Sequence, residues 1–148
     1  MVRKVDRKGT EKALRRTGVR ACRQQGDMAV TTRVLVLEDD VANRETLCAL
    51  LAQIGHGADP AASGEDALRL LANNPDFGLI ISDVVMPGMG GIEFARRARE
   101  VRPGVPIVLV TGDADAIESV IADGAIALLK PYSIETLCRV VAEALEPR

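Results

Sequence analysis

The sequence contains no tryptophan, one tyrosine and two phenylalanines, so aromatic residues make up only 2% of its 148 residues. Proteins that bind single-stranded nucleic acid usually stack the bases on aromatic side chains, so this class of function is not indicated. With so few rings, the core must be built from leucine, valine, isoleucine and alanine. Hydrophobic residues reach 47%, which is ordinary for a single globular domain of this length.

Long apolar runs are also missing. No stretch approaches the roughly 18 apolar residues that span a membrane, and the charged start of the chain lacks the apolar segment of a secretory signal. Cys22, Cys48 and Cys138 are odd in number and far apart, so they show neither metal-ligand spacing nor a disulfide framework. We therefore expect unreactive thiols, no membrane association and a reduced, cytoplasmic location.

Charge is distributed unevenly, although the formal net charge is only −2. Residues 1–27 carry nine Lys or Arg and three Asp or Glu, whereas residues 28–148 carry ten and eighteen. The acidic segment 28–148 argues against direct DNA binding, and we interpret it as one domain. Residues 1–27 lack apolar periodicity and are predicted to be a basic, disordered extension, for which an over-called start is one explanation.

From Arg33 onward, short apolar runs alternate with segments of helical spacing. Strands are predicted at 34–37, near 58–62, and at 77–82, 107–110 and 126–129. Pro60 suits an edge strand, while Ser63 and Ser133 are predicted helix N-caps. Five β-α units in succession predict an α/β fold, in which a five-stranded parallel sheet carries helices on both faces (flavodoxin-like).

Polar residues follow the predicted strands where each one ends. They are Glu38, Asp39 and Asp40 after the first strand, Asp83 after the third, Thr111 after the fourth and Lys130 after the fifth. Sites in parallel sheets lie at the carboxyl ends of the strands, so these side chains should meet. Clustered carboxylates repel one another unless a cation compensates, and a divalent ion such as Mg²⁺ or Mn²⁺ suits their oxygen atoms.

This set of residues favours phosphoryl chemistry. A carboxylate can act as the nucleophile and form an aspartyl phosphate, while a metal ion neutralises charge on the transferring group. Lys130 offers a positive partner for a phosphate oxygen, and Thr111 offers a hydroxyl donor. Alone, either Asp83 or Thr111 would be interpreted as an ordinary polar strand end. The acids, the threonine and the lysine together, in this order, are specific for such a site.

Four stretches resemble the receiver domains of two-component response regulators, and the resemblance covers about residues 33–146. The stretches are 34–40 (VLVLEDD), 79–91 (LIISDVVMPGMGG), 106–111 (PIVLVT) and 128–131 (LLKP). The resemblance implies that Asp83 is the phosphoacceptor, that Thr111 and Lys130 contact the phosphoryl group, and that the Lys130–Pro131 bond is cis. The implied metal ligands are Asp39 and Asp83 directly, Glu38 through water, and the backbone carbonyl of Val85.

The resemblance also implies partners. The phosphodonor would be a histidine kinase or a histidine phosphotransfer protein, the downstream protein target is unknown, and a homodimer is left open. The chain would catalyse only its own phosphorylation and dephosphorylation, so it is not expected to be an enzyme. His56, the single histidine, is interpreted as a surface turn residue rather than a relay histidine.

Two departures from the family pattern concern output. Family members usually carry an aromatic residue three positions before the lysine, where this chain has Ala127. The segment from Thr111 to Lys130 is also shorter than usual, which predicts a short or shifted fourth helix and docking through a different surface. Val85 and Asp113 occupy positions that tune phosphoryl lifetime in the family, and they indicate no clear lifetime here.

Other interpretations remain open at this point. A haloacid-dehalogenase-type phosphohydrolase would carry Asp-x-Asp after the first strand, where this chain has Glu38-Asp39-Asp40. A pseudo-receiver would usually have lost the acids or the lysine, which are all present. A receiver excised from a hybrid histidine kinase is the third alternative.

Overall fold

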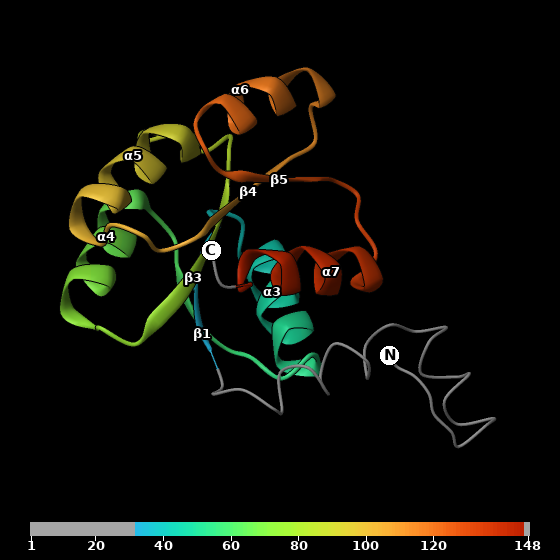
Figure 1. Cartoon of the computed structure of the whole chain (residues 1–148), viewed down its shortest axis with the longest axis horizontal. Coiled ribbons are helices and arrows are strands. Elements are labelled where there is room, and N and C mark those ends of the chain that lie inside the picture. Colours follow the sequence, from blue (N-terminus) through green and yellow to red (C-terminus); the bar gives the residue numbers. More distant parts are fainter. Residues whose placement is uncertain (1–31, 147–148) are drawn as a thin grey trace.

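The computed structural model describes residues 32–146, which form a single parallel sheet covered by helices on both faces (Figure 1). The strands are β1 (Arg33–Leu37), β2 (Gly57–Ala61), β3 (Phe77–Asp83), β4 (Ile107–Thr111) and β5 (Ile126–Leu129). Their order in the sheet is β2-β1-β3-β4-β5, with every neighbouring pair parallel. The predicted fold class is confirmed, whereas the predicted extension 1–27 lies outside the described residues.

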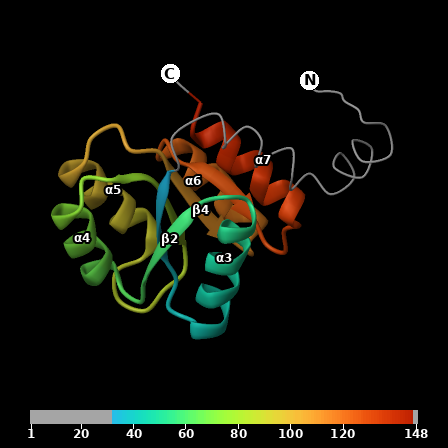
Figure 2. The same ribbon diagram turned by 90° about the horizontal axis from the view of Figure 1, so that it is seen from below.

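The helices alternate with the strands along the chain. They are α3 (Val41–Gln53), α4 (Gly64–Asn73), α5 (Gly91–Val101), α6 (Ile117–Ala122) and α7 (Ile134–Ala144), and the 3₁₀ turn η1 (Ala114–Ala116) leads into α6. Figure 2 shows α4 and α5 on one side of the sheet and α3 and α7 on the other. With six residues, α6 matches the expected short fourth helix.

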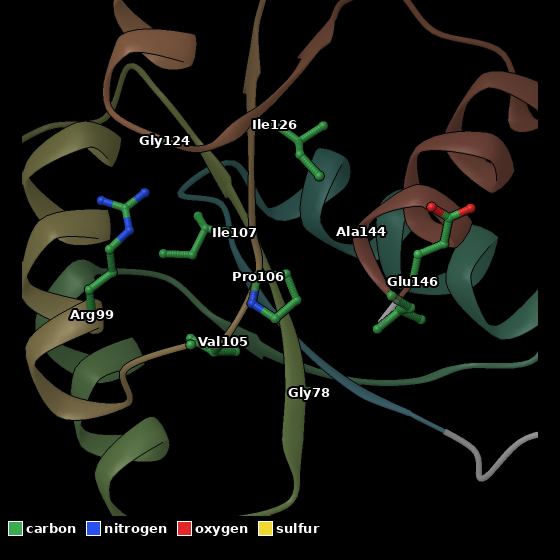
Figure 3. Close-up of a pocket in the computed structure, with 11 residues that line it drawn as sticks. Gly78, Arg99, Val105, Pro106, Ile107, Gly124, Ile126, Ala144 and Glu146 are labelled. Carbon is green, nitrogen blue, oxygen red and sulfur yellow. The ribbon is translucent and has the colours of Figure 1, made fainter. Parts of the chain in front are cut away.

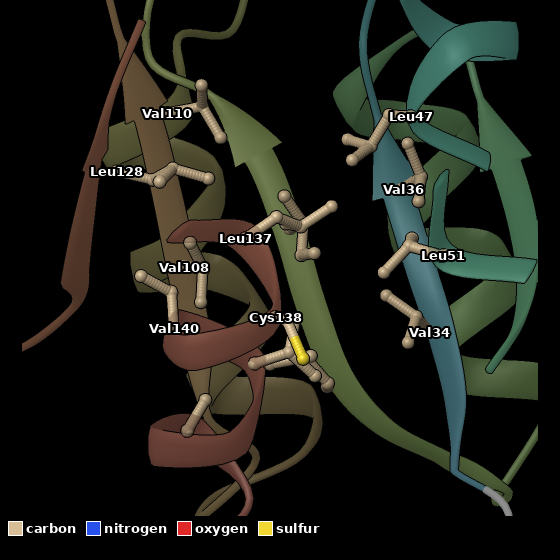
Figure 4. Packing of buried hydrophobic residues seen from close by; sticks show 14 of the residues in the cluster. Val34, Val36, Leu47, Leu51, Val108, Val110, Leu128, Leu137, Cys138 and Val140 are labelled. Atoms are coloured by element: carbon tan, nitrogen blue, oxygen red, sulfur yellow. The ribbon is translucent and has the colours of Figure 1, made fainter. Parts of the chain in front are cut away.

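The sheet separates two apolar clusters because neighbouring residues of a strand point to opposite faces. In β1, Val34 and Val36 pack with α3 and α7 (Figure 4), whereas Leu35 and Leu37 pack with α4 and α5. All four side chains are at most 1% exposed. A sheet covered on both faces has room for polar side chains mainly at its strand ends, which is where the candidate site residues lie.

Local signals in the sequence account for several element boundaries. The Ser63 hydroxyl accepts the Asp66 N–H at 3.2 Å and caps α4, and Ser133 caps α7 in the same way through Thr136 at 3.1 Å. Both predicted caps are therefore confirmed. Strand β2, which contains Pro60, lies at the edge of the sheet as predicted.

Two expectations about individual side chains are wrong. His56 is only 6% exposed because the turn after α3 folds back toward the start of β1, where its Nδ1 lies 3.4 Å from the Thr32 carbonyl oxygen. Burial lowers the pKa of its imidazole. Cys48 is a free, half-buried thiol, but Cys138 is disulfide-bonded, so the expected absence of disulfides does not hold for this residue; Cys22 lies outside the described residues.

Within residues 32–146, no helix combines the length and the apolar character needed to cross a membrane.

Arg102, just after α5, holds the loop between α4 and β3. Its guanidinium donates to the carbonyl oxygens of Leu71 at 2.9 Å, Asn74 at 2.8 Å and Phe77 at 3.2 Å. We expect Arg102→Ala to lower the free energy of unfolding by about 2 kcal/mol, because several carbonyls lose a charged donor at once. Urea unfolding measures this change.

Arg97, which lies within α5, provides the control for this variant. It is exposed and forms a 2.9 Å ion pair with Glu93 one turn away. Such pairs contribute roughly 0.3–0.5 kcal/mol, so Arg97→Ala should have a small effect. Equal effects of the two variants would contradict the role assigned to Arg102.

Candidate functional site

The acidic residues predicted at the strand ends meet at one edge of the sheet. Glu38 and Asp39 directly follow β1, and Asp83 is the last residue of its neighbour β3. One carboxylate oxygen from each of these residues lies within 4.8 Å of the other two. Sequence reasoning therefore placed these acids correctly, and hard oxygen atoms at this spacing fit a divalent cation.

Lys130 brings a positive charge to these carboxylates. Its Nζ lies 3.4 Å from Asp83 Oδ1 and 3.8 Å from Glu38 Oε1. The backbone positions it, because the Lys130 N–H donates to the Thr111 carbonyl at 2.7 Å. The next peptide bond, Lys130–Pro131, is cis as expected. Lys130 thus joins the acidic residues of β1 and β3 to the end of β4.

Burial disfavours the charged forms of Asp83 and Glu38. It raises the pKa of Asp83, and the Asp39 charge adds to this effect, while Lys130 opposes it. Burial also raises the pKa of Glu38, against a hydrogen bond from the Asp40 N–H. A bound divalent cation would favour the ionised forms of these carboxylates. The raised pKa values therefore fit a metal site, and so does the spacing of the carboxylate oxygen atoms.

The backbone of the acidic turn is held by α3. Arg44 Nη1 donates to the Glu38 carbonyl at 2.9 Å, and the Asp40 N–H donates to Glu38 Oε2 at 3.1 Å. The Asp40 carboxylate accepts the Asn43 N–H at 2.9 Å and so caps α3. Asp40 therefore serves as the solvent-exposed N-cap of α3 rather than as a member of the acidic cluster. The contribution of Arg44 was not predicted, because its contact depends on the tertiary fold.

The loop after Asp83 folds back tightly. The Gly91 N–H donates to the Val84 carbonyl at 2.8 Å, and the Val84 N–H donates to the Val110 carbonyl at 2.9 Å. Val85, the expected source of a backbone carbonyl ligand, lies in this loop and is 74% exposed. The close return at Gly91 fixes the backbone next to Asp83.

Thr111 ends β4 and is 2% exposed. Its hydroxyl oxygen accepts the Asp113 N–H at 3.0 Å, while its carbonyl binds Lys130 as described above. Thr111 is thus joined to Lys130 through the backbone at the same edge of the sheet. A hydroxyl that accepts one hydrogen bond keeps its own proton for donation to a ligand.

A cavity of about 350 Å³ opens beside Asp83 between α3 and the segment after β5. Leu47, Leu50 and Tyr132 form apolar parts of its wall, and Lys130 also lines it. The pKa of the Tyr132 phenol is raised by burial and by the negative charges of Glu38 and Asp83. The phosphoacceptor candidate can therefore be reached from a partly apolar cavity.

A larger cavity of about 550 Å³ lies where β4 and β5 begin, at the opposite end of the sheet. Figure 3 shows Arg99 from α5 and Glu146 from beyond α7 on opposite sides of it. Arg99 already pairs with Asp123 at 2.9 Å. None of the predicted site residues lines this cavity, so the strand-end cluster remains the candidate site.

The pKa values of Glu38 and Asp83 are raised in the folded protein. At pH values just above the ordinary carboxyl pKa, the folded protein therefore binds more protons than the unfolded chain. These groups should therefore lower stability as the pH rises through that window. Since metal binding requires ionised carboxylates, we expect millimolar Mg²⁺ to raise the melting temperature clearly at pH 7 and hardly at pH 4.

Glu38→Gln should weaken both the pH dependence and the Mg²⁺ effect, because it removes one buried ionisable group. Glu45→Gln is the matched control, since Glu45 is exposed on α3 and lies outside the acidic cluster. Thermal melts at the two pH values measure both effects. An equal Mg²⁺ effect at pH 4 and pH 7 would contradict carboxylate binding.

The sequence matches the family described as "Response regulator receiver domain" over residues 34–142. The response regulator receiver protein CpdR of Brucella abortus is 34% identical over 76% of this chain and 96% of its own length. The transcriptional regulatory protein AfsQ1 of Streptomyces coelicolor is 44% identical over 60% of this chain, and the match spans only 38% of that protein.

Solved structures show the same likeness. The chemotaxis protein CheY4 of Vibrio cholerae superposes with a TM-score of 0.71 at 31% identity, over 78% of this chain and all of CheY4 (100%).

Proposed function

This chain belongs to the response regulator receiver domain family, and we propose that phosphorylation of Asp83 is the switch by which it signals. It is a receiver of two-component phosphorelay signalling. One observation carries the proposal: the Asp83 carboxylate lies 3.4 Å from Lys130 Nζ, in a cluster with two further carboxylates. A nucleophilic carboxylate, a cation and hard oxygen ligands are what phosphoryl transfer to an aspartate requires.

In the proposed reaction, a carboxylate oxygen of Asp83 attacks the phosphorus atom of a phosphohistidine. The new O–P bond forms as the N–P bond breaks, and the imidazole leaves with the bonding electron pair. Lys130 offsets the negative charge of the phosphoryl oxygens, and the Thr111 hydroxyl donates to one of them. In a separate step, water attacks the same phosphorus atom, the O–P bond to Asp83 breaks, and inorganic phosphate leaves while Asp83 returns to a free carboxylate.

Mg²⁺, or Mn²⁺ in its place, would be held by Asp39 and Asp83 directly, by Glu38 through water and by the Val85 backbone carbonyl. When bound, this ion supplies neutralisation of the charge on the transferring phosphoryl group. The support for these ligands is the close approach of the three carboxylates and the raised pKa values of Glu38 and Asp83.

The proposed phosphodonor is a histidine kinase or a histidine phosphotransfer protein in the cytoplasm. The proposed output is phosphorylation-dependent binding to another protein, with no catalysis beyond the chain's own phosphorylation and dephosphorylation. Because α6 is short, we propose that the partner docks on a surface other than the one that includes this helix. A homodimer on that other surface is compatible with this arrangement.

The experiment that tests the proposal uses acetyl phosphate as a small phosphodonor. The full chain is incubated with it in the presence and absence of Mg²⁺, and intact mass reports phosphoryl uptake. We expect one phosphoryl group per chain, only with the metal, and peptide mapping should place it on Asp83. Absence of uptake under both conditions would favour a pseudo-receiver that binds partners without phosphorylation.

A further inference from the structure

The cavity at the amino ends of β4 and β5 has no part in the proposed phosphoryl chemistry. Its volume is about 550 Å³. Several apolar side chains of its wall are only partly buried, and they are Val105, Pro106, Ile126 and Leu145. Removing apolar surface from water is favourable, so an apolar group that enters this cavity would stabilise the domain.

The described part of the chain begins beside this cavity. Its first residue is Thr32, and a β-carbon placed on Gly78 would lie 2.9 Å from the γ-methyl carbon of Thr32. Gly78 itself lines the cavity. The 31 residues that precede Thr32 lie outside the described range. They are therefore attached to the domain next to the cavity.

The charges around the cavity favour a basic occupant. Arg99 Nη1 pairs with Asp123 Oδ2 at 2.9 Å, which compensates the positive charge on that side. Glu146 lines the opposite side, as Figure 3 shows. Together these three side chains carry a net negative charge, which attracts positively charged groups.

The sequence just before Thr32 matches the cavity in character and length. Met28, Ala29 and Val30 are apolar, and residues 1–27 carry nine Lys or Arg against three Asp or Glu. Alternate residues of an extended chain share one face, so Val30 and Met28 would follow Thr32 on the side that packs against Gly78. A sphere of about 550 Å³ is roughly 10 Å across, which an extended chain covers in about three residues.

We propose that this cavity is the docking site of the chain's own segment 28–31. The side chains of Met28 and Val30 cover the partly exposed apolar wall, and the basic residues before Met28 lie near Glu146. Docking requires no phosphoryl group, so it is independent of the proposed function. Because the cavity lies at the opposite end of the sheet from Asp83, docking keeps the basic segment away from the edge that a phosphodonor must reach.

Methyl NOEs in the full, isotope-labelled chain test this placement. We expect cross-peaks between the methyl groups of Val30 and those of Ile126 and Leu145. Gly104 and Gly124 also line the cavity, so their backbone amide shifts report its occupancy in the same sample. Absence of the Val30 cross-peaks would overturn the proposal, because the segment would then lie elsewhere.

Two variants of the full chain test the apolar contact. Val30→Asp should remove the cross-peaks of Met28 with the cavity wall and shift the Gly104 and Gly124 amides, because an unpaired charge is disfavoured in apolar surroundings. Its melting temperature should fall by about 4 °C, as expected when the burial of one valine is lost. Val19→Asp is the matched control, since it makes the same change in the same basic extension but outside 28–31. Equal effects of the two variants, or no effect of Val30→Asp, would overturn the proposal.

A mixed sample distinguishes docking within one chain from docking between copies. Labelled and unlabelled chains are combined in equal amounts, and isotope-filtered NOEs then report only contacts between chains. We expect no filtered cross-peak between Val30 and Ile126. If the cross-peaks appear in the filtered spectrum, a second copy supplies the segment and the proposal is overturned.

Discussion

Asp83→Ala is expected to abolish phosphoryl uptake from acetyl phosphate and Mg²⁺, with no residual modification in the intact mass spectrum. The reason is chemical, because the variant retains Lys130 and the other two acids but has lost the proposed nucleophile. The fold should remain, since the removed carboxylate is one whose charge burial disfavours. Circular dichroism and urea unfolding check that the protein is folded.

Asp40→Ala is the matched control for this variant. It removes a carboxylate from the same edge of the sheet, but that side chain is exposed and caps α3. Uptake should be retained, while the lost cap lowers the free energy of unfolding by about 1 kcal/mol. A phosphoryl group still found on Asp83→Ala would assign the acceptor to another carboxylate of the cluster.

Gly91→Ala is expected to lower the free energy of unfolding by about 3 kcal/mol, at the upper end of the usual overpacking effect. A β-carbon at this position would lie 2.2 Å from the Asp83 carbonyl oxygen and 2.8 Å from the Val84 Cα. Both neighbours are backbone atoms, which cannot rotate away. The loop must therefore shift, and the Asp83 carboxylate shifts with it, so phosphoryl uptake should also slow.

Gly90→Ala is the control in the neighbouring position. Its β-carbon would approach the Val84 carbonyl oxygen only to 3.4 Å, and its φ of −75° suits any residue. We expect a loss below about 1 kcal/mol, mainly from a poorer N-cap residue. Urea unfolding and the initial rate of uptake measure both variants, and similar losses for the two would contradict the role of the close approach at Gly91.

Much of the fold was predictable because its signals are local. The apolar runs gave the strands, Ser63 and Ser133 gave two helix starts, and Pro60 identified an edge strand. The acidic cluster was also predictable, because parallel strands bring their carboxyl ends to one edge. These inferences need only the order of residues along the chain and the geometry of a parallel sheet.

What sequence reasoning missed depends on contacts between distant segments. Arg102 and Arg44 donate to backbone carbonyls, and a carbonyl carries no sequence signal that could mark it as an acceptor. His56 was expected in a surface turn because two glycines flank it, but the turn folds toward Thr32. The Gly90-Gly91 pair was visible, yet only the structure shows that Gly91 alone lacks space for a β-carbon.

The scarcity of aromatic residues makes the site optically distinct. The whole chain has no tryptophan and a single tyrosine, so ultraviolet emission excited near the tyrosine band comes from Tyr132 alone. That ring lines the cavity that also contains Asp83 and Lys130. Changes in charge or solvation around the phosphoacceptor therefore reach a natural fluorophore directly. The unmodified protein carries its own spectroscopic probe, and titrations with metal or phosphodonor need no label.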